Sequence, residues 1–134
     1  DSYALSSFIR QARRGPIEIR ARHPVVRSYT SVSNLLGAAL GQLLVDEAGA
    51  HLLVETAGER EVEVGELAEL VRSIVAPAAE IDRAAPDGGP ADHYVGDGAA
   101  YRRLLQQHGI EEHPLAHQVA DTADYLVGLE EAGA

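Results

Sequence analysis

Two histidines and an aspartate near the end of the sequence have a spacing that could bind a metal ion. His113, His117 and Asp121 follow one another at intervals of four residues. Residues four apart lie on one face of a helix, and imidazole and carboxylate groups are both ligands of Zn²⁺. The alternative is a set of surface and capping groups, because Pro114 suits the first turn of a helix and would place His113 ahead of it. A small metal-dependent enzyme centred on these three residues is therefore one hypothesis.

Other catalytic patterns are missing from the sequence. The chain has no Cys, which excludes disulfides, thiolate catalysis and thiolate metal sites. No serine stands in the pattern of a nucleophile elbow. The Gly-rich stretches 87–90 and 95–98 follow no clear strand and lack the lysine of a phosphate-binding loop, so we interpret both as turns. We assign no catalytic residue and no cofactor, and the sequence favours a non-catalytic protein over an enzyme.

Charge is divided unevenly along the chain. Residues 1–27 contain six Arg and two carboxylates, a balance of +4, whereas residues 28–134 have a balance of −14. Such asymmetry predicts a basic segment that binds an acidic partner or docks on an acidic body of the same protein. Arg10, Arg13 and Arg14 are the candidates for these contacts. The alternative is that the three arginines form the solvated face of a helix.

The most apolar run of the sequence, residues 31–45, is predicted to form a helix. Two glycines four residues apart flatten one of its faces, and each costs roughly 1 kcal/mol relative to alanine in a helix. Close packing, either within the fold or across a dimer, should compensate for that cost. The residues that we expect at such a contact are Leu36, Gly37, Leu40, Gly41 and Leu44.

Hydrophobic periodicity predicts an α+β fold. Amphipathic helices are expected over four further segments, which are residues 3–14, 67–75, 99–108 and 114–131. Alternation of apolar and charged residues predicts a strand near 17–22 and a hairpin over 51–64. We expect these strands to form a small antiparallel sheet packed on helices, followed by a C-terminal helical pair.

The loop-rich stretch 86–92 is the one credible boundary in the sequence. It would separate an α+β core, residues 1–85, from the helical pair in residues 93–134, which we expect to pack on the same single domain. The element order up to residue 64 matches that of a winged helix. The expected recognition helix contains no Arg, and the expected wing has four Glu against Arg60. Because phosphate contacts dominate affinity for DNA, these charges argue against a nucleic-acid partner.

Taken together, these features predict a non-catalytic protein–protein interaction or assembly module that is homo-oligomeric. The expected partner is a second copy of the chain or another protein. Two alternatives remain open, the metal-dependent enzyme and an acidic regulator or inhibitor of a basic or nucleic-acid-binding partner. No apolar run reaches the roughly 20 residues that span a membrane, and we expect a cytoplasmic protein without membrane contact.

Overall fold

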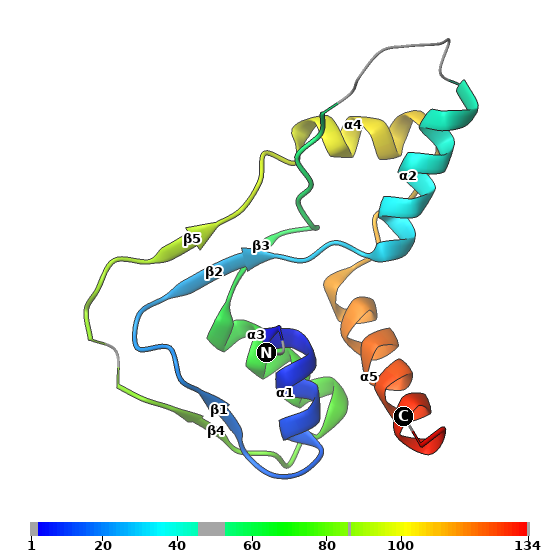
Figure 1. Cartoon of the computed structure of the whole chain (residues 1–134). Helices are drawn as coiled ribbons and strands as arrows, with labels where there is room; N and C mark the ends of the chain where they lie inside the picture. The colour runs from blue at the N-terminus through cyan, green and yellow to red at the C-terminus, as the bar shows by residue number, and fades with distance from the viewer. Residues whose placement is uncertain (1–2, 46–52, 86, 134) are drawn as a thin grey trace. The chain divides into compact units, whose positions relative to one another are not determined.

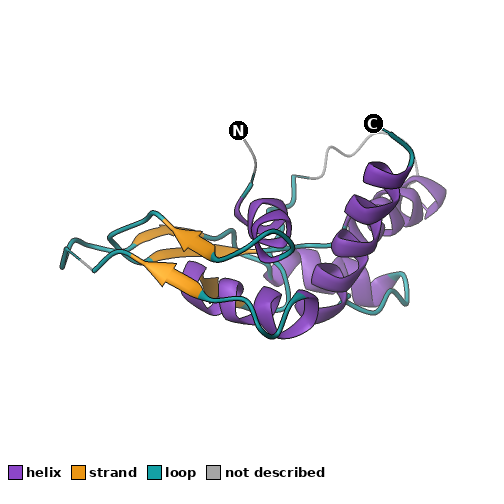
Figure 2. Ribbon diagram, turned by 90° about the horizontal axis from the view of Figure 1, so that it is seen from below, coloured by secondary structure: helices purple, strands orange, loops and turns teal. Residues whose placement is uncertain are grey.

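A computed structural model describes residues 3–45, 53–85 and 87–133 and has a mixed α+β arrangement (Figure 1). Helices account for more of these residues than the short strands do (Figure 2). This confirms the α+β class predicted from the sequence. The elements in chain order are α1 (Ala4–Ala12), β1 (Ile17–Ile19), β2 (Val25–Ser28), α2 (Val32–Val45), β3 (Glu61–Glu63), α3 (Val64–Val75), β4 (Ile81–Arg83), β5 (Asp92–Tyr94), α4 (Ala99–Gln107) and α5 (Leu115–Glu131).

The chain divides into two compact units, each built from segments that are distant in sequence. Unit 1 comprises residues 1–27, 62–93 and 116–134. Unit 2 comprises residues 28–61 and 94–115. Helix α4 therefore belongs to unit 2, and α5 from residue 116 onward belongs to unit 1. The single-domain organisation expected from the sequence stays a prediction.

Unit 1 has its core between α1, α3 and β1, which contact one another. The side chains of Ile9 in α1, Ile17 in β1 and Leu67 in α3 are completely buried. In β1 the residues alternate between buried and exposed, so the strand has one wet face, as its alternating sequence predicts. Burial of these aliphatic side chains supplies the main driving force for folding of this unit.

The pairing of β1 differs from the expected antiparallel sheet. Strand β1 pairs in parallel with β4, with Ile17 opposite Ile81 and Ile19 opposite Arg83. In Figure 1 the two strands run together beside α1. A parallel pair needs a long crossover connection, and here residues 20–80 separate the two strands. An alternating pattern shows that a strand has one wet face but carries no information about its partner, so the predicted antiparallel pairing was wrong.

The hairpin predicted over residues 51–64 is also absent from the described part of the chain, which begins again at residue 53. Residues 53–58 form no strand, and β3 instead adjoins β2 in a three-stranded sheet of order β3-β2-β5. The stretch before β3 packs on the chain that follows β2, where the Thr30 hydroxyl donates to the Ala57 carbonyl at 3.2 Å. Without a hairpin after α2, the winged-helix order is not completed.

The helices lie close to their predicted positions because their ends carry local signals. Helix α3 begins at Val64 rather than Leu67, since the Glu63 side chain accepts a hydrogen bond from the Gly65 N–H at 2.7 Å and caps the helix. Helix α4 is followed by Gly109 in the left-handed region, with φ of +63°, as expected of a glycine C-cap. Among the described residues, no helix is both long and apolar enough to cross a membrane.

Candidate functional site

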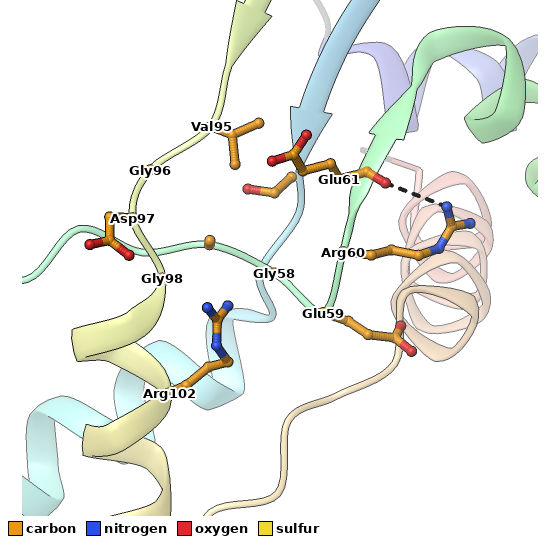
Figure 3. Close-up of a pocket in the computed structure, with 11 residues that line it drawn as sticks. Gly58, Glu59, Arg60, Glu61, Val95, Gly96, Asp97, Gly98 and Arg102 are labelled. Carbon is orange, nitrogen blue, oxygen red and sulfur yellow. Dashed lines mark hydrogen bonds between the residues drawn. The ribbon is translucent and has the colours of Figure 1, made fainter.

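A pocket of about 430 Å³ lies in unit 2, where three segments of the chain converge (Figure 3). The segments are the end of β2, the stretch that leads into β3, and the loop before α4 together with the first turns of that helix. Charged side chains and glycines make up most of the wall. The lining residues are Ser28, Ala57, Gly58, Glu59, Arg60, Glu61, Val95, Gly96, Asp97, Gly98 and Arg102.

Two glycines allow these segments to meet at backbone distance. A Cβ atom on Gly58 would lie 1.8 Å from the Tyr29 carbonyl oxygen, and one on Gly96 would lie 2.8 Å from the Thr56 carbonyl oxygen. Any side chain at either position would therefore push the segments apart. The pocket exists because glycine is the residue that permits such close approach.

The loop 95–98 connects strand β5 directly to helix α4 and is more than the simple turn expected from the sequence. The Asp97 N–H donates to a Glu55 carboxylate oxygen at 2.9 Å, and Asp97 Oδ1 accepts from the Ala99 N–H at 3.0 Å. The Asp97 carboxylate thus satisfies a backbone donor at the start of α4, where the helix dipole favours negative charge. A G-x-G sequence ahead of a helical pattern was the signal that could have identified this connection.

Arg102 is one of five charged residues that line the pocket. Its side chain extends from α4 toward the Gly58 and Gly98 backbones (Figure 3). Within the described part of the chain, its guanidinium makes no hydrogen bond. By contrast, Glu59 accepts a hydrogen bond from the Leu115 N–H at 2.9 Å, and Arg60 donates to the Glu61 carbonyl oxygen at 3.5 Å.

A partly buried carboxyl group, that of Glu112, interacts electrostatically with Glu59 and Arg102 of this pocket. Burial raises the pKa of the Glu112 carboxyl, Glu59 adds to that rise, and the positive charge of Arg102 partly opposes it. The Glu112 Oε1 atom has no hydrogen-bond partner among the residues that the structure describes. Burial also raises the pKa of the neighbouring Tyr101 phenol. Both groups are therefore held towards their neutral forms by burial.

The residues expected at an α2 contact separate into two sets. Leu36, Leu40 and Leu44 are 58%, 59% and 86% exposed. Gly37 and Gly41 instead pack inside unit 2, where a Cβ atom would lie 3.0 Å from Ile110 and 2.6 Å from the His108 ring, respectively. The sequence predicted close packing of these glycines either within the fold or across a dimer. The structure shows close packing within the fold.

The N-terminal arginines contact acidic groups of their own unit. Arg13 and Arg14 both form ion pairs with Glu130 of α5, at 3.0 and 3.4 Å. Arg10 lines a shallow groove of about 360 Å³ on the outer side of α1. Contacts of this kind are what a basic segment docked on the acidic body of the same protein would make, and no partner is needed to explain Arg13 or Arg14.

The candidate metal ligands are divided between the two units of the chain. His113 is in unit 2, ahead of α5, and its backbone N–H donates to Asn34 Oδ1 at 2.9 Å. His117 and Asp121 are on α5 in unit 1. Across the described ranges 3–45, 53–85 and 87–133, the structure brings together no group of three or more His, Cys, Asp or Glu side chains that could hold a metal ion.

Comparison with known proteins gives likenesses of structure alone. No protein-family model matches the sequence, and no curated protein matches it. One similar solved structure is that of TunA, a NAD-dependent NDP-hexosamine 5,6-dehydratase involved in tunicamycin biosynthesis, with 14% identity and a TM-score of 0.67. Another is a GDP-L-fucose synthetase from Naegleria fowleri, with 13% identity and a TM-score of 0.64.

These likenesses extend over almost the whole of this chain but over less than half of either neighbour. The matches cover 94% and 97% of this chain, and 40% and 41% of the dehydratase and the synthetase, respectively. At such low identity the comparisons establish that the fold is shared, because function depends on site residues that a fold does not determine.

Proposed function

We propose that this chain binds a nucleotide-linked sugar in the pocket of unit 2 and forms the corresponding portion of an enzyme that acts on such compounds. Both structural neighbours are named for nucleotide-linked sugars, one an NDP-hexosamine and the other GDP-L-fucose. The pocket volume of about 430 Å³ falls within the range of small-molecule sites, roughly 300–1,000 Å³. The observation that carries the proposal is the Arg102 guanidinium, which extends into this pocket without a hydrogen-bond partner among the described residues.

The chemistry of the pocket suits a ligand that combines phosphate with hydroxyl groups. A guanidinium binds phosphate oxygens through two parallel N–H donors. The start of α4 adds the positive end of a helix dipole. Glu61 and Asp97 bring carboxylate oxygens, which accept hydrogen bonds from sugar hydroxyls. The arginine favours the phosphate part of such a ligand and the carboxylates favour its hydroxyl groups. A simple anion would be attracted by the arginine but repelled by the carboxylates.

Calorimetric titration of the purified chain with UDP-N-acetylglucosamine and with GDP-L-fucose tests this proposal. A charge-assisted hydrogen bond contributes about 1.5–3 kcal/mol, so Arg102→Ala should weaken binding roughly 10- to 100-fold. Arg103→Ala is the matched control, because Arg103 is an exposed arginine of the same helix that does not line the pocket. Equal effects of the two substitutions, or no saturable binding of either compound, would contradict the proposal.

A dinucleotide does not fit the same loop. A dinucleotide-binding turn has the sequence G-x-G-x-x-G, in which the second glycine lets the pyrophosphate approach the backbone and the third allows close helix packing. The one G-x-G of this sequence is Gly96-Asp97-Gly98, and the place of the third glycine is taken by Tyr101. The space that a Cβ on Gly98 would need is filled by Ala57 Cβ, 2.7 Å away. The proposal therefore assigns this chain no NAD site.

A protein–protein interaction module is the second candidate function, and one observation favours it. Seven of the 14 residues of α2 are large apolar side chains that are more than a third exposed. A homo-oligomer would be one way to cover them, and its test is the solution mass measured by light scattering at low and high salt. A monomer at both salt concentrations would contradict the homo-oligomer. A cytoplasmic location accompanies both candidate functions as a prediction.

A further inference from the structure

One face of α2 has the composition of a buried helix although it is exposed. The helix contains no charged residue along its 14 positions. Leu36, Leu40 and Leu44 follow one another at intervals of four on a single face. A helix that is apolar all round normally lies in an interior, and soluble monomers rarely expose a contiguous apolar patch of more than a few hundred Å². This face is therefore a candidate interface with another polypeptide surface.

Unit 2 covers only the other side of the helix. Ala38 is buried against Tyr101 and Leu105 of α4, and the two helix glycines pack on His108 and Ile110. The exposed leucines lie outside this packing, with Leu43 and Leu44 at 75% and 86% exposure. Most of the exposed side chains of α2 are large and apolar, although Ser33 is exposed as well. A mostly apolar surface of this kind resembles a permanent interface, which is more apolar than a transient one.

We infer that the exposed face of α2, defined by Leu36, Leu40, Leu43 and Leu44, docks on an NAD-binding polypeptide that corresponds to the part of the neighbours lying outside the match. This inference rests on the proposed function for the kind of enzyme concerned. About 60% of each neighbour lies outside the match, since this chain covers 40% and 41% of them. One of these neighbours is NAD-dependent.

The misfit of a dinucleotide to this chain's own loop points to the same partner. An NAD-dependent reaction on a sugar bound in unit 2 would need a dinucleotide site on another stretch of polypeptide. A second copy of this chain would cover the leucines but would bring the same Gly96-Asp97-Gly98 loop with Tyr101 in place of the third glycine. An NAD-binding polypeptide would both cover the apolar face and supply the dinucleotide site that the loop 95–98 does not fit.

Site-specific photo-cross-linking identifies the occupant directly. The photoreactive residue p-benzoylphenylalanine replaces Leu40 in the protein as its source cells produce it, and cross-linked peptides are identified by mass spectrometry after irradiation. The matched control carries the same residue at Tyr125, an exposed aromatic residue on α5 that is 65% exposed. The expected result is a cross-link, specific to position 40, to a polypeptide with a G-x-G-x-x-G loop that binds NADH in a fluorescence titration.

Three outcomes would overturn the inference. They are a cross-link to residues 32–45 of a second copy, the same products from positions 40 and 125, and no cross-link at all. Leu40→Glu in the purified chain should leave affinity for UDP-N-acetylglucosamine within twofold of wild type, because Leu40 does not line the pocket. Failure of cross-linking with intact Arg102-dependent sugar binding removes this inference alone. Specific cross-linking without sugar binding removes the proposed function alone.

Discussion

Helices α1 and α2 differ in which of their residues are buried and which are exposed to solvent. In α1 the apolar residues Phe8, Ile9 and Ala12 are buried, and the following arginines pair with Glu130 of the same unit. In α2 the buried residues are Asn34 and Ala38, while leucines dominate the exposed side. The apolar face of α1 is thus buried within its own unit, whereas large apolar side chains of α2 stay exposed on one side of the helix.

The most apolar segment of a sequence is therefore not necessarily the segment that contributes most to the buried core. The buried residues of unit 1 come from shorter segments with strict helical spacing, such as α3. The long apolar run of α2 has leucines on several faces, and within the described residues of unit 2 the side that carries Ala38 and the two glycines packs on α4, His108 and Ile110. This excess of apolar residues over packing partners within unit 2 is the observation on which the proposed docking of α2 on another polypeptide rests.

The largest expected effect contrasts a buried leucine with an exposed one. Leu67 in α3 is completely buried, whereas Leu40 in α2 is 59% exposed. Leu67→Ala should lower the free energy of unfolding by about 2–5 kcal/mol, because it leaves a cavity. Leu40→Ala should change that free energy by less than about 0.5 kcal/mol in the isolated chain. Urea denaturation followed by circular dichroism measures both, and a similar loss from the two substitutions would refute the contrast.

The next effect concerns two glycines in helix interiors. A Cβ at Gly41 of α2 would lie 2.6 Å from the His108 ring, whereas one at Gly128 of α5 would meet nothing within 4 Å. Gly41→Ala should therefore destabilise the fold by about 1–3 kcal/mol through overpacking. Gly128→Ala should stabilise it by up to about 1 kcal/mol through helix propensity. Thermal denaturation distinguishes these opposite signs, and stabilisation by both would show that His108 moves aside freely.

Two carboxyl groups should differ in how stability depends on pH. Hydrogen bonding from Arg83, at 2.7 and 2.9 Å, lowers the pKa of Glu63. Its contribution is therefore present above the ordinary glutamate pKa of 4.5 and is lost as the pH falls through the lowered folded-state value. Burial raises the pKa of Glu112 above the ordinary glutamate value of 4.5. The fold is therefore destabilised progressively as the pH rises from that ordinary value to the raised folded-state value, and the destabilisation is fully present above the raised value.

Substitution by glutamine separates these two cases. Glu63→Gln should cost about 1–2 kcal/mol at pH 7, where hydrogen bonds to a charged partner are lost, and much less at pH 3. Glu112→Gln should stabilise the protein slightly at pH 7 and change nothing at pH 3. Denaturant midpoints at both pH values provide the measurement. If Glu63→Gln lowered the free energy of unfolding equally at pH 7 and pH 3, the stabilisation by Glu63 would not depend on its charge.

The smallest expected effect concerns the exposed ion pair between Arg13, which follows α1, and Glu130 of α5. Arg13 pairs with Glu130 at 3.0 Å, but both side chains are more than 30% exposed. Because solvent-exposed pairs contribute only about 0–1 kcal/mol, Arg13→Ala should lower stability by less than about 1 kcal/mol at low salt. The loss should shrink further in 0.5 M salt, and Arg20→Ala serves as a comparison. A larger loss that persists at high salt would point to packing by the arginine side chain instead.

The helices of this protein could be predicted from the sequence alone, whereas strands β4 and β5 were not predicted. The spacing of apolar residues predicted α1, α3, α4 and α5, and a following glycine predicted the end of α4 at Gly109. These signals succeed because a helix forms between residues that are close in the chain, and its caps act within a few residues of each end. The sequence also singled out residues 31–45, although it did not show which of their faces is covered.

Tertiary structure alone decided the pairing of strands and the candidate site. Ile17 pairs with Ile81, and the pocket joins Gly58 to Gly96 and Arg102. Contacts between residues so far apart leave no periodic trace in the sequence, because any strand with one wet face can pair with any other. Arg102 looked like one of two adjacent helix arginines until the fold placed the Gly58 and Gly98 backbones beside it. Local periodicity predicts the helices, and only long-range packing decides which strands form and which side chains come together.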